Sequence, residues 1–168
     1  MAHPHAHRYN HQQYQYKDLL QRSVNFILAN QQANGDYYIA QGNAGNQVAR
    51  LYSHAIATLA MCEAYGMTKD QDLAAAAQSA VNYVAFAQIP NDGGWRYTSN
   101  DPRGDTSVVG WALMALKSAH MAYLHVDSNT YRGASMFLDS VQVDGGAGYG
   151  YTQRQTTPPT AAFWSAIT

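Results

Sequence analysis

The sequence has little charge and almost no cysteine, and each shortage limits what the protein does. Charged residues make up 12% of the 168 positions and the formal net charge is −1. A balance this close to zero gives no electrostatic attraction to nucleic acid or to an anionic membrane, so we expect neither as a partner. Cys62 is the only cysteine, which rules out an intramolecular disulfide. Because it lies in an Ala-rich run, we expect a buried and unreactive thiol.

Long apolar runs are also missing. No stretch of 18 apolar residues occurs, so the sequence predicts no transmembrane helix. The first residues lack the apolar core of a signal peptide, and a native N-terminus would indicate the cytoplasm. His3, His5, His7 and His11 crowd this end. We interpret residues 1–15 as a disordered or tag-like segment, with loose binding of a transition metal as the alternative.

Several catalytic motifs are absent as well. The sequence has no phosphate-binding glycine loop, no HExxH, no GxSxG and no Cys-Gly-Glu-Gln thioester run. The Gly-rich stretch at 145–150 is therefore interpreted as an ordinary loop. We expect no cofactor and no metal site.

A short repeated pattern is what the chain does contain. Three glutamines each precede an aromatic residue by seven positions, and a glycine-containing loop separates the two. The pairs are Gln31 with Tyr38, Gln88 with Trp95, and Gln142 with Tyr149. The glutamines are 57 and then 54 residues apart, which indicates one structural unit stacked three times.

Helical periodicity between the glutamines predicts an all-α fold with no substantial sheet. The expected helices are 17–33, 48–65, 70–88, 105–124, 128–142 and 157–168. They form three helical hairpins over about 17–66, 68–125 and 127–168, the last one truncated. Gly66 is expected just past a helix end, and Thr68 is expected to cap the next helix. A glutamine at a helix end can bond backbone groups of the next hairpin while the ring packs against it.

The segment Ala-Val-Asn-Tyr-Val-Ala-Phe-Ala-Gln-Ile-Pro-Asn-Asp-Gly-Gly-Trp, residues 80–95, closely resembles the QW repeat of squalene–hopene cyclases. Residues 132–142 with the following loop are similar to a second copy, and 20–38 to a third. The resemblance implies the α/α toroid that these cyclases share with protein prenyltransferase β-subunits, in which outer and inner helices alternate around a cavity. Complete toroids have about six hairpins, so this chain corresponds to roughly half a ring. Self-association or packing against further repeats is then expected.

Asp105 is the one candidate for family chemistry, since it opens an expected inner helix. Aligned with the Asp-X-Asp-Asp-Thr motif of the cyclases, the proton-donating position holds Gly104. Aligned with the Asp-X-Cys zinc ligands of prenyltransferases, the cysteine position holds Ser107. The competing interpretation is that Asp105 only caps its helix.

We therefore expect a non-catalytic binding or scaffold domain with a concave surface that takes an apolar or isoprenoid small molecule. The expected lining, beside Asp105, is Tyr52, His54, Trp95, Arg96, Tyr97, Trp111, Tyr149 and Tyr151. The alternative is a terpenoid-cyclase-like or prenyltransferase-like enzyme acting on an isoprenoid. In that enzyme Asp105 would be the acid or metal ligand, and Trp95 and Trp111 would stabilise carbocations.

Overall fold

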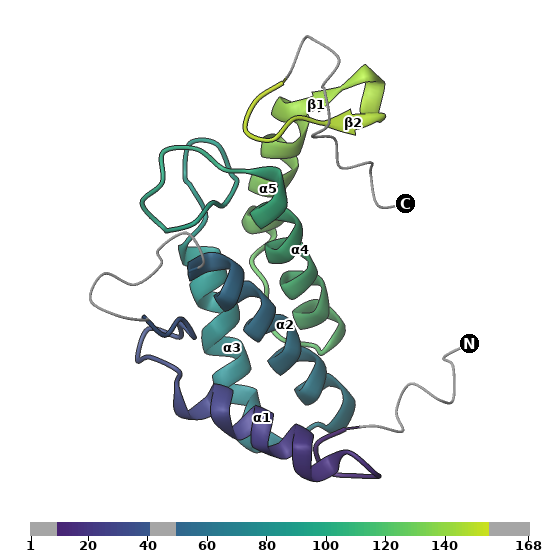
Figure 1. Cartoon of the computed structure of the whole chain (residues 1–168). Helices are drawn as coiled ribbons and strands as arrows, with labels where there is room; N and C mark the ends of the chain where they lie inside the picture. Colours follow the sequence, from purple (N-terminus) through teal and green to yellow (C-terminus); the bar gives the residue numbers. More distant parts are fainter. Residues whose placement is uncertain (1–9, 41–49, 155–168) are drawn as a thin grey trace.

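The computed structural model describes residues 10–40 and 50–154 of the chain (Figure 1). Its helices and strands are α1 (Lys17–Ala29), α2 (Arg50–Thr68), α3 (Gln71–Phe86), α4 (Thr106–Met121), α5 (Ser128–Val141), β1 (Gln142–Val143), the short 3-10 helix η2 (Asp144–Gly146) and β2 (Gly148–Tyr149). The two short strands pair antiparallel. The prediction of an all-α fold is confirmed. No helix in the described residues is long and apolar enough to cross a lipid bilayer.

Two predictions concern the chain ends. The helix expected at 157–168 lies outside the described residues, as do residues 1–9 of the His-rich segment. Of residues 10–15, Asn10 and His11 are buried and the other four are exposed. His11 is only 4% exposed, and its Nε2 lies 2.9 Å from Oδ2 of Asp70.

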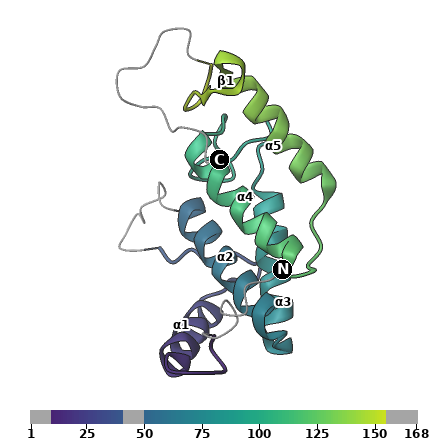
Figure 2. The same cartoon turned by 90° about the vertical axis from the view of Figure 1, so that its right-hand side faces the viewer.

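Helices α2 and α4 run side by side and parallel through the middle of the molecule (Figures 1 and 2). Their register is constant along their length. The Tyr52 hydroxyl meets Ser107 Oγ near their first turns, and Ser118 Oγ donates to Glu63 Oε1 at 3.3 Å further along. Both pairs are 55 residues apart in sequence. Residues that face each other on α2 and α4 are therefore separated in sequence by 55 residues, between the two glutamine spacings of 57 and 54.

The junction between the first two hairpins differs from our prediction. Gly66 lies inside α2, which continues to Thr68. A Cβ at Gly66 would lie 3.3 Å from the Cβ of Ala122, so glycine serves close packing rather than helix termination. Asp70, and not Thr68, caps α3 by accepting the Asp72 N–H. Asp127 caps α5 in the same way, so the two aspartates begin equivalent helices.

The repeated glutamines join each hairpin to the next. Gln31 Nε2 donates to the carbonyl of Ala76 at 2.8 Å, and Gln88 Nε2 donates to the carbonyl of Thr130 at 2.8 Å. Ala76 lies on α3 and Thr130 on α5, the first helices of the following units. Each such bond contributes about 1 kcal/mol net. The predicted amide joint is present at both junctions within the described residues.

A glycine follows each glutamine at the same junction. Gly35 has φ +93° and Gly93 has φ +75°. A Cβ on either glycine would collide with the backbone of the next unit, at Ser79 for Gly35 and at Gly133 for Gly93. The glycines therefore provide both a left-handed backbone and a close approach between units. Gly146, with φ +101°, takes this place in the third copy.

The aromatic residue of the first copy is Tyr37 and not Tyr38. Trp95 follows its positive-φ glycine by two residues, is 1% exposed, and donates its indole N–H to the Val84 carbonyl at 2.7 Å. Tyr37 also follows its positive-φ glycine by two residues, and it is 5% exposed. The first loop is one residue shorter than the second, which moves the equivalent ring one position closer to the glutamine.

The third copy has a different loop. Here the glutamine and the aromatic residue are direct cross-strand partners, Gln142 opposite Tyr149, in the β1–β2 hairpin. The Gln142 side chain makes no hydrogen bond to any residue in 10–40 or 50–154. The aromatic ring of Tyr149 packs against the core without the indole-to-carbonyl bond of Trp95.

Candidate functional site

Four hydroxyl groups from three successive units meet at the first turns of α2 and α4. The Tyr52 hydroxyl bonds Ser107 Oγ, and the Tyr97 and Tyr151 hydroxyl oxygens lie 2.7 Å apart. The rings of Tyr52 and Tyr97 approach to 6.2 Å between centroids, which links the two pairs. We call Tyr52, Tyr97, Ser107 and Tyr151 the hydroxyl cluster. Three of them were predicted as lining residues, and the structure brings these three together.

Repeated backbone bonds position the cluster. The Leu51 N–H, in the first turn of α2, donates to the Tyr97 carbonyl at 3.1 Å. The Thr106 N–H, at the start of α4, donates to the Tyr151 carbonyl at 2.8 Å. Each helix start thus uses an otherwise unpaired N–H to hold the loop of the following unit. The tyrosines lie beside the helix starts because those loops are fixed there.

The carboxylate beneath the cluster caps α4. Asp105 is fully buried, and its Oδ1 accepts the Val108 N–H at 2.9 Å and the Ser107 hydroxyl at 2.6 Å. The Asp105 N–H donates to the Trp95 carbonyl at 2.8 Å, so the cap is also tied to the preceding loop. Its Oδ2 is buried and has no partner among the described residues. The geometry of a helix cap is present.

The direction of hydrogen bonding is fixed from Tyr52 through Ser107 to Asp105. Ser107 donates its only hydroxyl hydrogen to Asp105, so Tyr52 must donate to Ser107. The Tyr97–Tyr151 pair shares one of its two hydrogens and keeps the other available. The cluster therefore offers one phenolic donor and several oxygen acceptors.

Asp105 gives the cluster a negative field. Burial is the largest cause that raises the pKa of Tyr52 and of Tyr151, and the charge of Asp105 raises both further. The two phenols stay protonated at neutral pH. A negative group brought to the cluster would be repelled by the same carboxylate, so this field disfavours anions at the site.

The position of the cyclase proton donor has no room for an acid. A Cβ on Gly104 would lie 2.8 Å from the Cα of Gly94 and 3.0 Å from the ring of Phe137. Ser107, at the position of the prenyltransferase cysteine, is engaged with Asp105. Within residues 10–40 and 50–154, no three His, Cys, Asp or Glu side chains gather to hold a metal ion.

Two predicted lining residues lie in the core instead. Trp95 is 1% exposed and His54 is fully buried, so neither forms a surface that a ligand reaches. Trp95 was also predicted as a structural residue of the repeat, and its bond to the Val84 carbonyl agrees with that role. His54 faces inward because it lies on the side of α2 that packs against α3.

The remaining predicted lining residues take no part in the hydrogen bonds of the hydroxyl cluster. The Arg96 guanidinium lies 5.1 Å from the centre of the Tyr97 ring. Trp111 is half-buried on the second turn of α4. Tyr149 is half-buried in strand β2.

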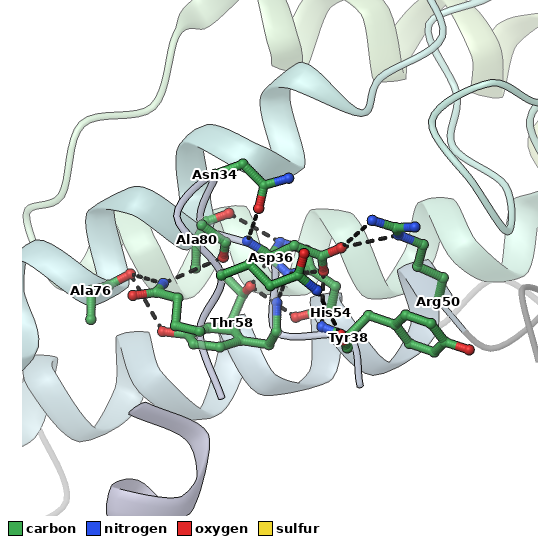
Figure 3. A network of polar contacts seen from close by, with 12 residues as sticks. Asn34, Asp36, Tyr38, Arg50, His54, Thr58, Ala76 and Ala80 are labelled. Atoms are coloured by element: carbon green, nitrogen blue, oxygen red, sulfur yellow. Dashed lines mark hydrogen bonds and ion pairs between the residues drawn. The ribbon is translucent and has the colours of Figure 1, made fainter. Parts of the chain in front are cut away.

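A buried ion pair that we did not predict connects the first loop to α2 (Figure 3). Asp36 is fully buried, and its Oδ2 lies 3.0 Å from Arg50 Nε and 2.8 Å from Nη2. Its Oδ1 accepts the Tyr38 N–H at 3.0 Å and lies 3.3 Å from His54 Nδ1. Burial alone would raise the pKa of Asp36, but His54, Tyr38 and Arg50 together hold that pKa at about 2.

His54 extends this network to α3. Its Nε2 lies 3.1 Å from the Ala80 carbonyl and its Nδ1 lies 3.2 Å from the Tyr37 N–H. An unprotonated Nδ1 accepts from Tyr37, whereas a protonated one donates to the neighbouring carboxylate. The imidazole is enclosed by the rings of Tyr37 and Tyr83, 5.8 and 4.7 Å away between centroids. This buried network therefore joins the loop that contains Asp36 to both α2 and α3.

Sequence reasoning missed Asp36 because its repeat equivalent, Gly94, is apolar. The available signal was the spacing of Arg50 and His54, four residues apart and hence on one helix face. An aspartate that follows a glycine in the loop before this helix is a candidate carboxylate partner for the two side chains.

Comparison with known proteins gave no assignment. Searches against models of protein families, curated proteins and solved structures all found no match.

Proposed function

We propose that this chain is a non-catalytic helical-repeat binding domain, built as a segment of an α/α toroid. Its hydroxyl cluster would receive a neutral polar group of a small molecule or of a partner. The observation that carries the proposal is the hydrogen-bond order of the cluster, in which Asp105 accepts from Ser107 and from the backbone of α4. A carboxylate used in this way orients phenols for binding.

The repeated junctions support the toroid part of the proposal. Gln31 and Gln88 make the same bond to the next unit, and Leu51 and Thr106 hold the next loop in the same way. Units related by one repeated displacement curve into an arc.

The charge of the site argues against an isoprenoid diphosphate. Asp105 raises the pKa of both Tyr52 and Tyr151, and such a field repels phosphate oxygens. A neutral acceptor, such as an amide carbonyl or a hydroxyl, would instead take the free phenolic hydrogen of the Tyr97–Tyr151 pair.

Binding at the cluster is tested by NMR on protein labelled in the tyrosine rings, with N-methylacetamide as a neutral probe and acetate as a charged one. We expect the amide to shift the Tyr97 and Tyr151 signals, and acetate to leave them unchanged. In Tyr97→Phe the amide should still shift the Tyr151 signals, because the Tyr151 hydroxyl keeps its own hydrogen and has lost its partner. Equal shifts with acetate and amide would contradict the proposed neutral site.

Catalysis is tested by incubating wild type and Asp105→Asn with squalene and with farnesyl diphosphate. We expect no product from either protein. Product formed by wild type and lost in Asp105→Asn would replace the binding domain with a cyclase-like or prenyltransferase-like enzyme. Asparagine keeps a side-chain oxygen for the cap, so the comparison isolates the acid.

A further inference from the structure

A cavity of about 230 Å³ lies far from the hydroxyl cluster, between α1, the second half of α2 and the segment before α1. Figure 1 shows α1, in purple, beside this end of α2. The cavity wall is mainly apolar, with Leu20, Val24, Ile27, Met61, Ala64 and Met67 as its larger part. An apolar protein cavity of about 150 Å³ binds benzene, so this volume holds a small organic molecule.

One polar side chain in this wall lacks a partner. His11 lines the cavity, its side chain is 1% exposed, and its Nδ1 is buried without a hydrogen bond. Other polar groups of the wall are already engaged. Ser23 donates to the Leu19 carbonyl at 3.1 Å, and Asn10 Oδ1 accepts two backbone N–H groups at 2.9 and 3.0 Å. Leaving a buried acceptor unpaired is unfavourable, which makes Nδ1 the place for a ligand contact.

The second nitrogen of His11 determines what Nδ1 offers. Nε2 lies 2.9 Å from Asp70 Oδ2, and the bond to His11 is the largest cause that lowers the pKa of Asp70. An ionised carboxylate only accepts, so Nε2 carries a hydrogen. When the imidazole is neutral, Nδ1 presents a lone pair and requires a donor. Asp70 also caps α3, which fixes the orientation of the ring.

We propose that this cavity binds a small neutral alcohol or phenol, whose hydroxyl donates to Nδ1 of His11 and whose apolar body fills the space between α1 and α2. An anion would lose its hydration against the mainly apolar wall. A cation would lose its hydration in an apolar cavity. The remaining class is a molecule with an apolar body and one hydroxyl group.

The test compares two ligands of identical composition, hexan-1-ol and 1-methoxypentane, by titration calorimetry on the full chain. Both fill the same volume, and only the alcohol donates a hydrogen bond. We expect wild type to bind the alcohol about tenfold more tightly than the ether. Histidine ¹⁵N NMR should show a change at Nδ1 of His11 with the alcohol and none with the ether.

Two variants separate the hydroxyl contact from the cavity. His11→Phe keeps a ring but removes the acceptor, so the two ligands should bind equally. Ala60→Leu adds volume at a lining position and should weaken both ligands alike. If His11→Phe fails to fold, the preference of wild type for the alcohol over the ether and the ¹⁵N change at His11 still test the proposal.

Other outcomes overturn the proposal. One is equal affinity of wild type for the alcohol and the ether. Another is that neither ligand binds up to its solubility limit in water. The third is tighter binding of hexanoate or hexylamine than of hexan-1-ol. Hexanoate binding would mean that His11 is an imidazolium, with Nδ1 as a donor. None of these outcomes affects the hydroxyl cluster at the opposite end of α2.

Discussion

Gln88, just after the first helix of the second hairpin, reaches the carbonyl of Thr130 in the next hairpin, 2.8 Å away. The same amide hydrogens also face the Gly93 carbonyl at 2.7 Å, so one side chain ties its own loop and the following helix together. Gln31 makes the equivalent bond to Ala76. Repetition of this joint allows each contact to be compared with a matched position elsewhere in the chain.

Replacing Gln88 with alanine should lower the free energy of unfolding by about 1–3 kcal/mol, because two carbonyls lose their donor. For a chain of this size, that corresponds to a melting temperature lower by roughly 2–4 °C per kcal/mol. Gln142→Ala is the control, since the Gln142 side chain makes no hydrogen bond within the described residues. Equal losses in both variants, measured by urea unfolding, would contradict a joint formed by Gln88.

Gly93→Ala should destabilise by at least about 2 kcal/mol, from a strained positive φ and a collision with the backbone at Gly133. Gly110 offers the opposite case, because a Cβ there meets nothing within 4 Å and the residue lies inside α4. Gly110→Ala should stabilise by about 0.5–1 kcal/mol through helix propensity. Thermal unfolding of both variants checks the signs, and a stable Gly93→Ala would show that the two units are further apart.

Trp95→Ala should cost about 3–5 kcal/mol, since it removes a buried indole and leaves the Val84 carbonyl without its donor. Trp111 is half-buried on α4, and Trp111→Ala should cost only about 1 kcal/mol. Chemical denaturation of the two variants gives the comparison. A Trp95→Ala protein with an unchanged midpoint would place this ring outside the core.

Acid should weaken the Asp36–Arg50 network over a defined range of pH. The pKa of Asp36 is lowered from 3.8 to about 2 in the folded chain. Its contribution, about 2 kcal/mol, is complete above pH 4 and is lost as the pH falls through 2.

Wild type should therefore lose about 2 kcal/mol more than Asp36→Asn between pH 5 and pH 2. Asparagine does not titrate, so the difference between the two slopes isolates Asp36. Parallel pH profiles of unfolding free energy would mean that the carboxyl is not paired with Arg50 and His54.

Particular residues show how far sequence reasoning reached. Gln88 and Trp95 were predicted from their spacing, because a helix end and a glycine turn have strong local signals. Tyr38 was predicted where Tyr37 fills the place, since a loop shorter by one residue changes which ring faces the core. Gly66 was predicted to end a helix, but its close contact with Ala122 comes from another unit and leaves no local signal.

The site was predicted in part for the same reason. Tyr52, Tyr97, Tyr151 and Asp105 were named because inner helices and Gly/aromatic loops were expected to line a concave surface. Backbone bonds from Leu51 and Thr106 hold the loops of Tyr97 and Tyr151 at the helix starts. His54 and Trp95 were named with them and proved to be buried. Burial depends on which neighbouring segments pack against a residue, and these come from other parts of the chain.

The amino-acid sequence by itself determined the helices, their repeat and the amide joint, because these depend on hydrophobic period and on short-range backbone chemistry. Only the tertiary structure decided which polar groups are enclosed. Asp36 is buried and paired by α2, and His11 is buried and paired by the start of α3. Both helices are distant from these residues in sequence. Desolvation is a property of the packed neighbours, and no single stretch of sequence encodes it.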